Sequence, residues 1–123
     1  MPRVVIADDD ADIRDLVSFK LSAAGFEVEA FGDGESALDA ALANVPDLLL
    51  LDVMMPKLTG TEVVAALRRD PRTAAVPVIL LTARSQEIDV ERGFDAGADD
   101  YMIKPFSPRE LVRRAEAAVN RAR

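Results

Sequence analysis

Side chains that could carry out phosphoryl transfer stand directly after four short apolar runs of this 123-residue chain. They are Asp8 and Asp9 after residues 3–7, Asp52 after residues 48–51, Thr82 after residues 76–81, and Lys104 after residues 100–103. An aspartate can act as a nucleophile and become an aspartyl phosphate. Such a transfer depends mainly on positioning and on neutralising charge, so it needs no histidine. The residue types therefore suit phosphoryl transfer to an aspartate, if the fold brings them together.

Three of these side chains are carboxylates, which repel one another at close range unless a divalent cation joins them. The chain contains no histidine and no cysteine, so a metal here would have oxygen ligands. Oxygen ligands suit magnesium, manganese or calcium, and magnesium keeps several waters for substrate oxygens. We therefore expect Mg²⁺ as the cofactor, with Lys104 and Thr82 near the remaining oxygens of a phosphoryl group.

The composition disfavours several other classes of protein. A formal net charge of −7 argues against direct binding of nucleic acid, because a nucleic-acid-binding surface is basic. The absence of cysteine excludes disulfide bonds and thiolate catalysis. The first residues do not resemble a signal peptide, and no apolar run approaches the length of a membrane span. We expect a cytoplasmic protein with no membrane association.

Asp52 occupies the central position of this pattern, because it follows four consecutive leucines. An unbroken apolar run is typical of a strand buried on both faces of a parallel sheet. Pro56 cannot continue such a strand, so the strand must end near Asp52. Open α/β sheets bind their ligands at this carboxyl end. Considered alone, Asp52 could also be a helix cap or a loop acid.

Apolar runs and helical periodicity alternate along the whole chain. Strands are expected over residues 3–7, 26–31, 48–52, 76–81 and 100–103, and helices over residues 11–24, 34–45, 59–70, 85–96 and 108–120. The apolar side of the first helix, read from helical spacing, consists of Ile13, Leu16, Val17, Leu21 and Ala24. The alternation predicts an α/β fold with a five-stranded parallel doubly wound (flavodoxin-like) sheet and five helices on two faces. The simplest strand order is 2-1-3-4-5, whose switch point lies between the first and third strands.

The polar residues form a specific pattern when they are taken together. It consists of Asp8-Asp9 after the first strand, LLLLDVMMPKLTG around Asp52, Thr82-Ala83 after the fourth strand, and Lys104-Pro105-Phe106 after the fifth. Over essentially the whole chain, this pattern resembles the receiver domain of bacterial two-component response regulators. The resemblance implies a single receiver domain over residues 1–123 that resembles the chemotaxis receivers. It also implies a signalling switch rather than a dedicated enzyme.

The resemblance assigns a role to each acid of the pattern. Asp52 would be the phosphoacceptor. Asp9, Asp52 and the backbone carbonyl of Met54 would bind Mg²⁺ directly, whereas Asp8 would bind it through water. Self-catalysed phosphotransfer and dephosphorylation would be properties of the switch.

The resemblance also assigns roles on the phosphoryl side. Lys104 would pair with phosphoryl oxygens, Thr82 would donate a hydrogen bond to one of them, and the small Ala83 would leave room for the group to enter. Tyr101 would be a switch residue that turns inward when Thr82 moves; its plainer interpretation is an ordinary half-buried aromatic. The Lys104–Pro105 peptide bond is expected to be cis.

Such a receiver takes its phosphoryl group from a sensor histidine kinase or a phosphotransfer protein. It acts on a downstream effector domain or protein through the face formed by the fourth helix, the fifth strand and the fifth helix. Residues 97–101 are similar to those of receivers of winged-helix transcriptional regulators, which dimerise through charged pairs on this face. Asp100 and Arg114 suit one pair of a phosphorylation-dependent homodimer, whereas Val90 and Glu116 stand where basic residues would be expected.

Two other functions remain open on the sequence. A haloacid-dehalogenase-like phosphatase would use Asp8 and Asp10 at the end of the first strand, but it would give Asp52 no role and is usually longer. A pseudo-receiver would be a binding module that is never phosphorylated. Substitution of Asp52 or of Asp8 by asparagine separates the receiver from the phosphatase, because the two functions require different phosphoacceptors.

Overall fold

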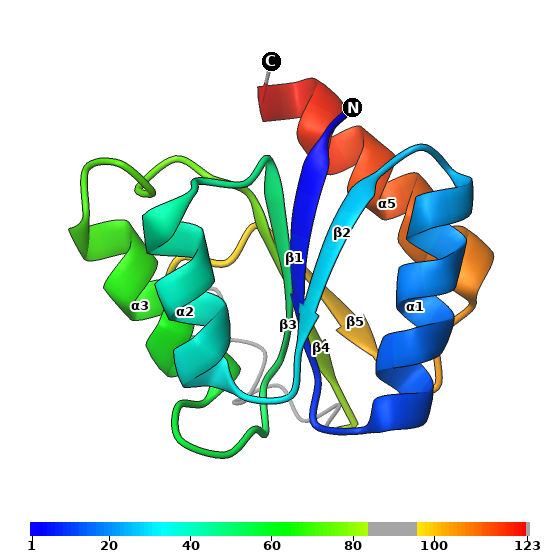
Figure 1. Cartoon of the computed structure of the whole chain (residues 1–123), viewed down its shortest axis with the longest axis horizontal. Helices are drawn as coiled ribbons and strands as arrows, with labels where there is room; N and C mark the ends of the chain where they lie inside the picture. Colours follow the sequence, from blue (N-terminus) through cyan, green and yellow to red (C-terminus); the bar gives the residue numbers. More distant parts are fainter. Residues whose placement is uncertain (84–95, 123) are drawn as a thin grey trace.

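The computed structural model describes residues 1–83 and 96–122. Five parallel strands form one sheet in the order β2-β1-β3-β4-β5 (Figure 1). Their bounds are Arg3–Ala7 (β1), Glu27–Phe31 (β2), Leu48–Asp52 (β3), Val78–Thr82 (β4) and Asp100–Ile103 (β5). The predicted strand order is therefore confirmed. The strand expected over residues 76–81 begins two residues later than predicted, because Val76 and Pro77 belong to the preceding loop.

Helices cover both faces of the sheet. Their bounds are Ala11–Ala23 (α1), Gly34–Ala43 (α2), Gly60–Arg69 (α3) and Pro108–Ala122 (α5). In Figure 1, α1 and α5 lie on one face of the sheet, and α2 and α3 lie on the other. The helix expected over residues 85–96 falls almost entirely outside the described residues.

The strand side chains divide the core into two halves. Leu48 and Leu50 pack toward α1 and α5, whereas Leu49 and Leu51 pack toward α2 and α3. All four are fully buried, as expected for a central strand covered on both faces. β3 is therefore held on every side, and the residue that ends it has a fixed position.

Local capping signals define where two helices begin. The Asp10 carboxylate accepts hydrogen bonds from the backbone N–H groups of Asp12 and Ile13 at the start of α1. At the start of α3, Thr59 and Glu62 form a capping box. Leu16 lies on the apolar side of α1 by helical spacing, but its exposed fraction is 46%. The buried stripe of α1 is narrower than its apolar stripe.

The β3–α3 loop is unusually tight against the end of β3. A Cβ atom on Gly60 would lie 2.5 Å from the carbonyl oxygen of Asp52, so only glycine fits there. It is this close approach to the Asp52 carbonyl that requires glycine at the position. Lys57 in the same loop has a φ of 71°, a left-handed conformation that non-glycine residues rarely adopt.

Both ends of the described chain lie at the same edge of the sheet. In Figure 1, the N-terminus before β1 and the end of α5 are at the top, whereas the strands point downward to the opposite, carboxyl edge. None of the described helices is long and apolar enough to span a membrane.

Candidate functional site

Three carboxylates meet at the carboxyl edge of the sheet. Asp8 and Asp9 follow β1, and Asp52 ends the neighbouring strand β3. One oxygen from each carboxylate lies within 4.8 Å of the others. Asp8 and Asp52 are buried, whereas Asp9 is exposed. The predicted gathering of the acids at the switch point of the sheet is thus what the structure shows.

Asp8 is fully buried, and each of its backbone and side-chain polar atoms makes a hydrogen bond. Its backbone N–H donates to the carbonyl of Phe31, and its own carbonyl accepts from Nη1 of Arg14 at 2.8 Å. Its Oδ1 atom accepts from the backbone N–H of Asp10, and its Oδ2 atom accepts from Lys104 Nζ. The first acid of the pair therefore has a defined position.

Lys104 places its ammonium group between two of the acids. Its Nζ atom lies 2.8 Å from Oδ2 of Asp8 and 3.1 Å from Oδ2 of Asp52. The side chain is only 16% exposed, so water screens these ion pairs weakly. From the sequence, Lys104 is expected near the oxygens of a phosphoryl group. In this structure, its Nζ atom contacts the carboxylates of Asp8 and Asp52.

The burial of Asp52 changes its acidity. Loss of water contact and the negative charge of Asp8 raise the pKa of Asp52 to about 6, although the hydrogen bond from Lys104 partly opposes this. Burial lowers the pKa of Lys104, but its hydrogen bonds to Asp8 and Asp52 outweigh that effect and leave it raised. Near neutral pH the site therefore contains an ionised Asp52 beside a protonated lysine.

Met54, two residues after Asp52, also contacts the Asp52 carboxylate. The backbone N–H of Met54 donates to Oδ1 of Asp52 over 3.3 Å, and the Met54 side chain is 53% exposed. This turn brings the Met54 backbone to the acids.

Thr82 and Ala83 lie at the end of β4, between the ends of β3 and β5. The Thr82 side chain is buried, and its carbonyl accepts a hydrogen bond from the backbone N–H of Lys104 at 2.6 Å. Ala83 is exposed at the same edge. The Lys104–Pro105 peptide bond is cis, as predicted.

Tyr101 lies in the middle of β5, opposite Leu80 of β4, and packs against the core beneath α2 and α3. Because alternate residues of a strand share a face, Thr82 lies on the same face as Leu80. Thr82 and Tyr101 are therefore on one side of the sheet, and Tyr101 is half-buried.

The charged pair expected across a dimer forms within one chain. Nη1 of Arg114 lies 3.0 Å from Asp100, and Nη2 lies 2.9 Å from Glu110. Glu116 is exposed on α5, and Val90 lies outside the described residues. The structure thus satisfies Arg114 without a second copy.

Two contributors to the site were not identified from the sequence. Arg14 contacts Asp8 through a long side chain, and nothing in its spacing indicates which way it turns. Gly60 supports the end of β3 through a tertiary contact, which no local pattern predicts. The donor set itself suits a hard cation, because three carboxylates and the nearby Met54 backbone offer only oxygen ligands.

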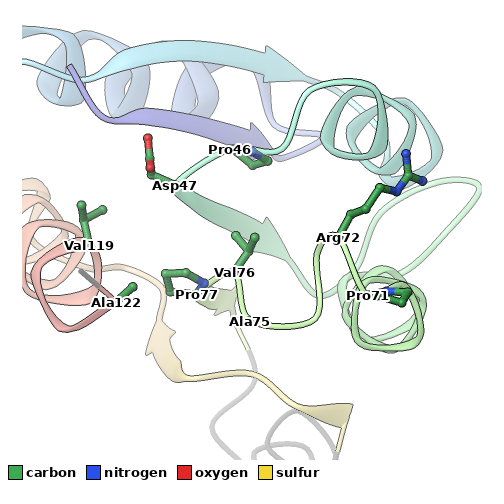
Figure 2. A pocket seen from close by; sticks show the side chains of 9 residues that line it. All are labelled: Pro46, Asp47, Pro71, Arg72, Ala75, Val76, Pro77, Val119 and Ala122. Carbon is green, nitrogen blue, oxygen red and sulfur yellow. The ribbon is translucent and has the colours of Figure 1, made fainter.

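A separate hollow of about 230 Å³ lies at the opposite, amino edge of the sheet (Figure 2). Its lining includes Asp47, Arg72 and Val119. Asp47 accepts a hydrogen bond from the backbone of Arg3, and Arg72 pairs with Asp70. Its charged groups are thus already engaged, and none of the three acids lines it.

Comparison with known proteins gave a match over almost the whole chain. Residues 4–116 match the family described as "Response regulator receiver domain". The chain is 48% identical over 121 residues to the "DNA-binding dual master transcriptional regulator RpaA" of Synechocystis, covering 98% of this chain and 50% of that protein. It is 42% identical over 119 residues to the "DNA-binding response regulator MtrA" of Mycobacterium tuberculosis, covering 97% of this chain and 51% of that protein. The chain thus spans about half the length of these curated relatives.

Solved structures show the same architecture. Chemotaxis response regulator CheY4 of Vibrio cholerae superposes with a TM-score of 0.91 at 35% identity, covering 96% of this chain and 98% of that one. A structure described as the BeF3-activated DrrB receiver domain superposes with a TM-score of 0.87 at 37% identity, covering 98% of each chain.

Proposed function

This chain belongs to the response regulator receiver family, and from that premise we propose that residues 1–123 form one receiver domain in which Asp52 accepts a phosphoryl group. The arrangement of Asp52 carries the proposal: it ends a fully buried strand, and its carboxylate contacts Lys104 beside Asp8 and Asp9. A receiver of this kind is a signalling switch rather than a classical enzyme. Self-catalysed phosphotransfer and later hydrolysis are the only reactions that we assign to it.

In the transfer step, a carboxylate oxygen of Asp52 attacks the phosphorus atom of the donor. A new P–O bond forms as the bond to the leaving group breaks, and that group departs with its electron pair. Because the pKa of Asp52 is about 6, the nucleophile is mostly ionised at neutral pH. The proposed donor is a phosphohistidine on a sensor histidine kinase or on a phosphotransfer protein.

The other side chains of the site position the transferred group. Lys104 exchanges its contact with Asp52 for the phosphoryl oxygens, and its charge offsets theirs. The Thr82 hydroxyl donates a hydrogen bond to one of these oxygens. Ala83 is small and exposed at the sheet edge, which leaves space for the group to enter.

The acids fit a magnesium ion. Asp9, Asp52 and the Met54 carbonyl would hold Mg²⁺ directly, and Asp8 would hold it through water. When bound, the ion supplies positive charge that stabilises the phosphoryl group during transfer.

The signal would leave through the surface formed by β5, α5 and the helix expected over residues 85–96. As Thr82 moves toward the phosphoryl group, Tyr101 on the same sheet face turns inward and alters the surface of β5, α5 and the helix expected over residues 85–96. A downstream effector domain or protein would bind that surface, and a phosphorylation-dependent homodimer would use it. The two relatives named above are DNA-binding regulators, so the effector would contact DNA while this acidic domain would not. We place the protein in the cytoplasm.

The test is phosphorylation in vitro with acetyl phosphate and Mg²⁺, followed by intact mass spectrometry. We expect one phosphoryl adduct on the wild type and on the control Asp39→Asn, which removes an exposed carboxylate on α2. The adduct should be absent without Mg²⁺ and absent from Asp52→Asn. An adduct that persists in Asp52→Asn but is lost in Asp8→Asn would favour the phosphatase alternative. Mg²⁺ binding without any adduct would indicate a pseudo-receiver.

A further inference from the structure

Arg14 occupies a place in the site that the transfer step does not use. It extends from the first turns of α1 back to the β1–α1 loop, where Nη1 donates to the backbone carbonyl of Asp8 over 2.8 Å. The side chain is half-buried. It therefore ties the helix to the peptide unit that joins the two acids Asp8 and Asp9.

We propose that Arg14 is a positioning residue for the metal-binding acids, because it fixes the peptide unit between Asp8 and Asp9. The proposal rests on the proposed function insofar as these acids bind Mg²⁺. Arg14 touches no reacting atom in it. It acts by fixing the orientation of the backbone at Asp8 and Asp9.

The backbone of Asp8 is held on both sides, through the peptide unit before it and the peptide unit after it. On one side, the backbone N–H of Asp8 donates to the carbonyl of Phe31 at the end of β2. On the other, Arg14 holds the Asp8 carbonyl. Between them, Gly32 leaves space for the guanidinium, since a Cβ atom there would lie 3.1 Å from Nη1 of Arg14. The end of β2 thus holds the peptide unit before Asp8, and Arg14 of α1 holds the peptide unit between Asp8 and Asp9.

Asp9 needs such support more than the other acids do. Within residues 1–83 and 96–122, hydrogen bonds hold the carboxylates of Asp8 and Asp52, but none holds the carboxylate of Asp9. The direction of the exposed Asp9 side chain therefore depends on its backbone. The groups that orient metal ligands commonly change metal affinity by about 10- to 100-fold when they are removed.

The direction in which Mg²⁺ affinity changes when Arg14 is removed distinguishes a positioning role from a purely electrostatic one. Arg14 is a cation near a cation site, so by electrostatics alone its removal should tighten Mg²⁺ binding. If Arg14 positions the acids, its removal should weaken Mg²⁺ binding in spite of the lost repulsion. The two explanations predict opposite changes in one measured quantity.

The experiment measures the Mg²⁺ dissociation constant of the full chain by isothermal titration calorimetry. Arg14→Met removes the donor and the charge but keeps an extended side chain, and we expect it to raise the dissociation constant by about tenfold. Arg14→Lys keeps a charged donor and should lose less affinity. Lys20→Met removes an exposed cation from the same helix and should match the wild type. Circular dichroism and thermal melting establish that each variant is folded.

Labelling by acetyl phosphate supplies a second readout. In Arg14→Met, the rate should need more Mg²⁺ to reach half its maximum, while the maximum at saturating Mg²⁺ stays close to that of the wild type. If Arg14→Met does not fold, Arg14→Lys carries the test and should still bind Mg²⁺ less tightly. Unchanged or tighter binding in a folded Arg14 variant would overturn the proposal. Wild-type Mg²⁺ binding without phosphorylation would overturn the proposed function alone.

Discussion

The ammonium group of Lys104 lies 3.1 Å from Oδ2 of Asp52, so the proposed nucleophile and its neighbouring cation are in direct contact. The same ammonium lies 2.8 Å from Asp8. Lys104 therefore offsets the negative charge of both buried carboxylates. In the proposed function, Mg²⁺ would compete with this ammonium for the acids, and a phosphoryl group would draw it away from Asp52.

Lys104→Met should separate metal binding from phosphoryl transfer. Removing the ammonium leaves Asp8 and Asp52 without their positive partner, so Mg²⁺ should bind several-fold more tightly, as measured by calorimetry. Labelling by acetyl phosphate should slow by about 100-fold, because a charged donor to the phosphoryl oxygens is lost. Lys20→Met is the control and should change neither. Weaker Mg²⁺ binding in Lys104→Met would show that the lysine organises the acids rather than competing for them.

Asp52→Asn should stabilise the metal-free protein in a pH-dependent manner. Folding raises the pKa of Asp52 from 3.8 to about 6, so the folded state binds this proton more tightly than the unfolded state does. Ionisation of this carboxyl therefore lowers the free energy of unfolding progressively as the pH rises from about 4 to about 6. Above that range, the loss of stability stays at its full size. Asparagine removes this penalty.

The measurement is urea unfolding in EDTA between pH 4 and pH 8. At pH 7.5, Asp52→Asn should increase the free energy of unfolding by about 1–3 kcal/mol, and the gain should shrink toward zero near pH 4. Asp39→Asn, on the exposed side of α2, should show little gain at either pH. A gain that is the same at both ends of the pH range would contradict the assignment to Asp52 ionisation.

Gly60→Ala should destabilise the fold and disturb Asp52. The added methyl group would meet the Asp52 carbonyl oxygen at 2.5 Å, and backbone atoms of a central strand cannot move aside as a flexible side chain can. We expect a loss of about 1–3 kcal/mol in urea unfolding, together with slower labelling. Thr61→Ala changes the next residue of α3 and should cost less than about 0.5 kcal/mol. Equal stability of Gly60→Ala and the wild type would refute the close contact.

Lys57→Gly should stabilise the chain relative to Lys57→Ala. Lys57 has a φ of 71°, where a side chain costs about 1–2 kcal/mol, while glycine adds about 0.5–1 kcal/mol of unfolded-state entropy. Glycine should therefore be more stable than alanine by about 0.5–1 kcal/mol in urea unfolding. Both variants remove the lysine charge, so their difference isolates the backbone. Alanine equal to glycine would place Lys57 outside the left-handed region.

Much of the fold could be predicted because its signals are local. The run Leu48–Asp52 gives a strand that is buried throughout, and the Thr59–Glu62 capping box starts α3 where the residues indicate. Parallel strands place their carboxyl ends at one edge, so the meeting of Asp8 with Asp52 followed from topology. The helix over residues 85–96 stays a prediction.

The features that could not be predicted depend on side chains reaching across the fold. Helical spacing identifies an apolar stripe but not its buried width, which is why Leu16 is exposed. Arg14 and Arg114 have long side chains, and their partners are fixed only when neighbouring elements are in place. Arg114 accordingly pairs with Asp100 of its own chain, where the sequence suggested a pair between two copies.

The two chain ends lie at the amino edge of the sheet, and the acids lie at the carboxyl edge (Figure 1). Anything tethered to either end, whether a second domain or a purification tag, starts on the far side of the molecule from Asp52. Such an attachment therefore begins away from the edge that a phosphodonor would approach in the proposed function. Its point of attachment has no direct contact with the acids. In the proposed function, the effect of phosphorylation would therefore reach a tethered domain through the strands and helices in between.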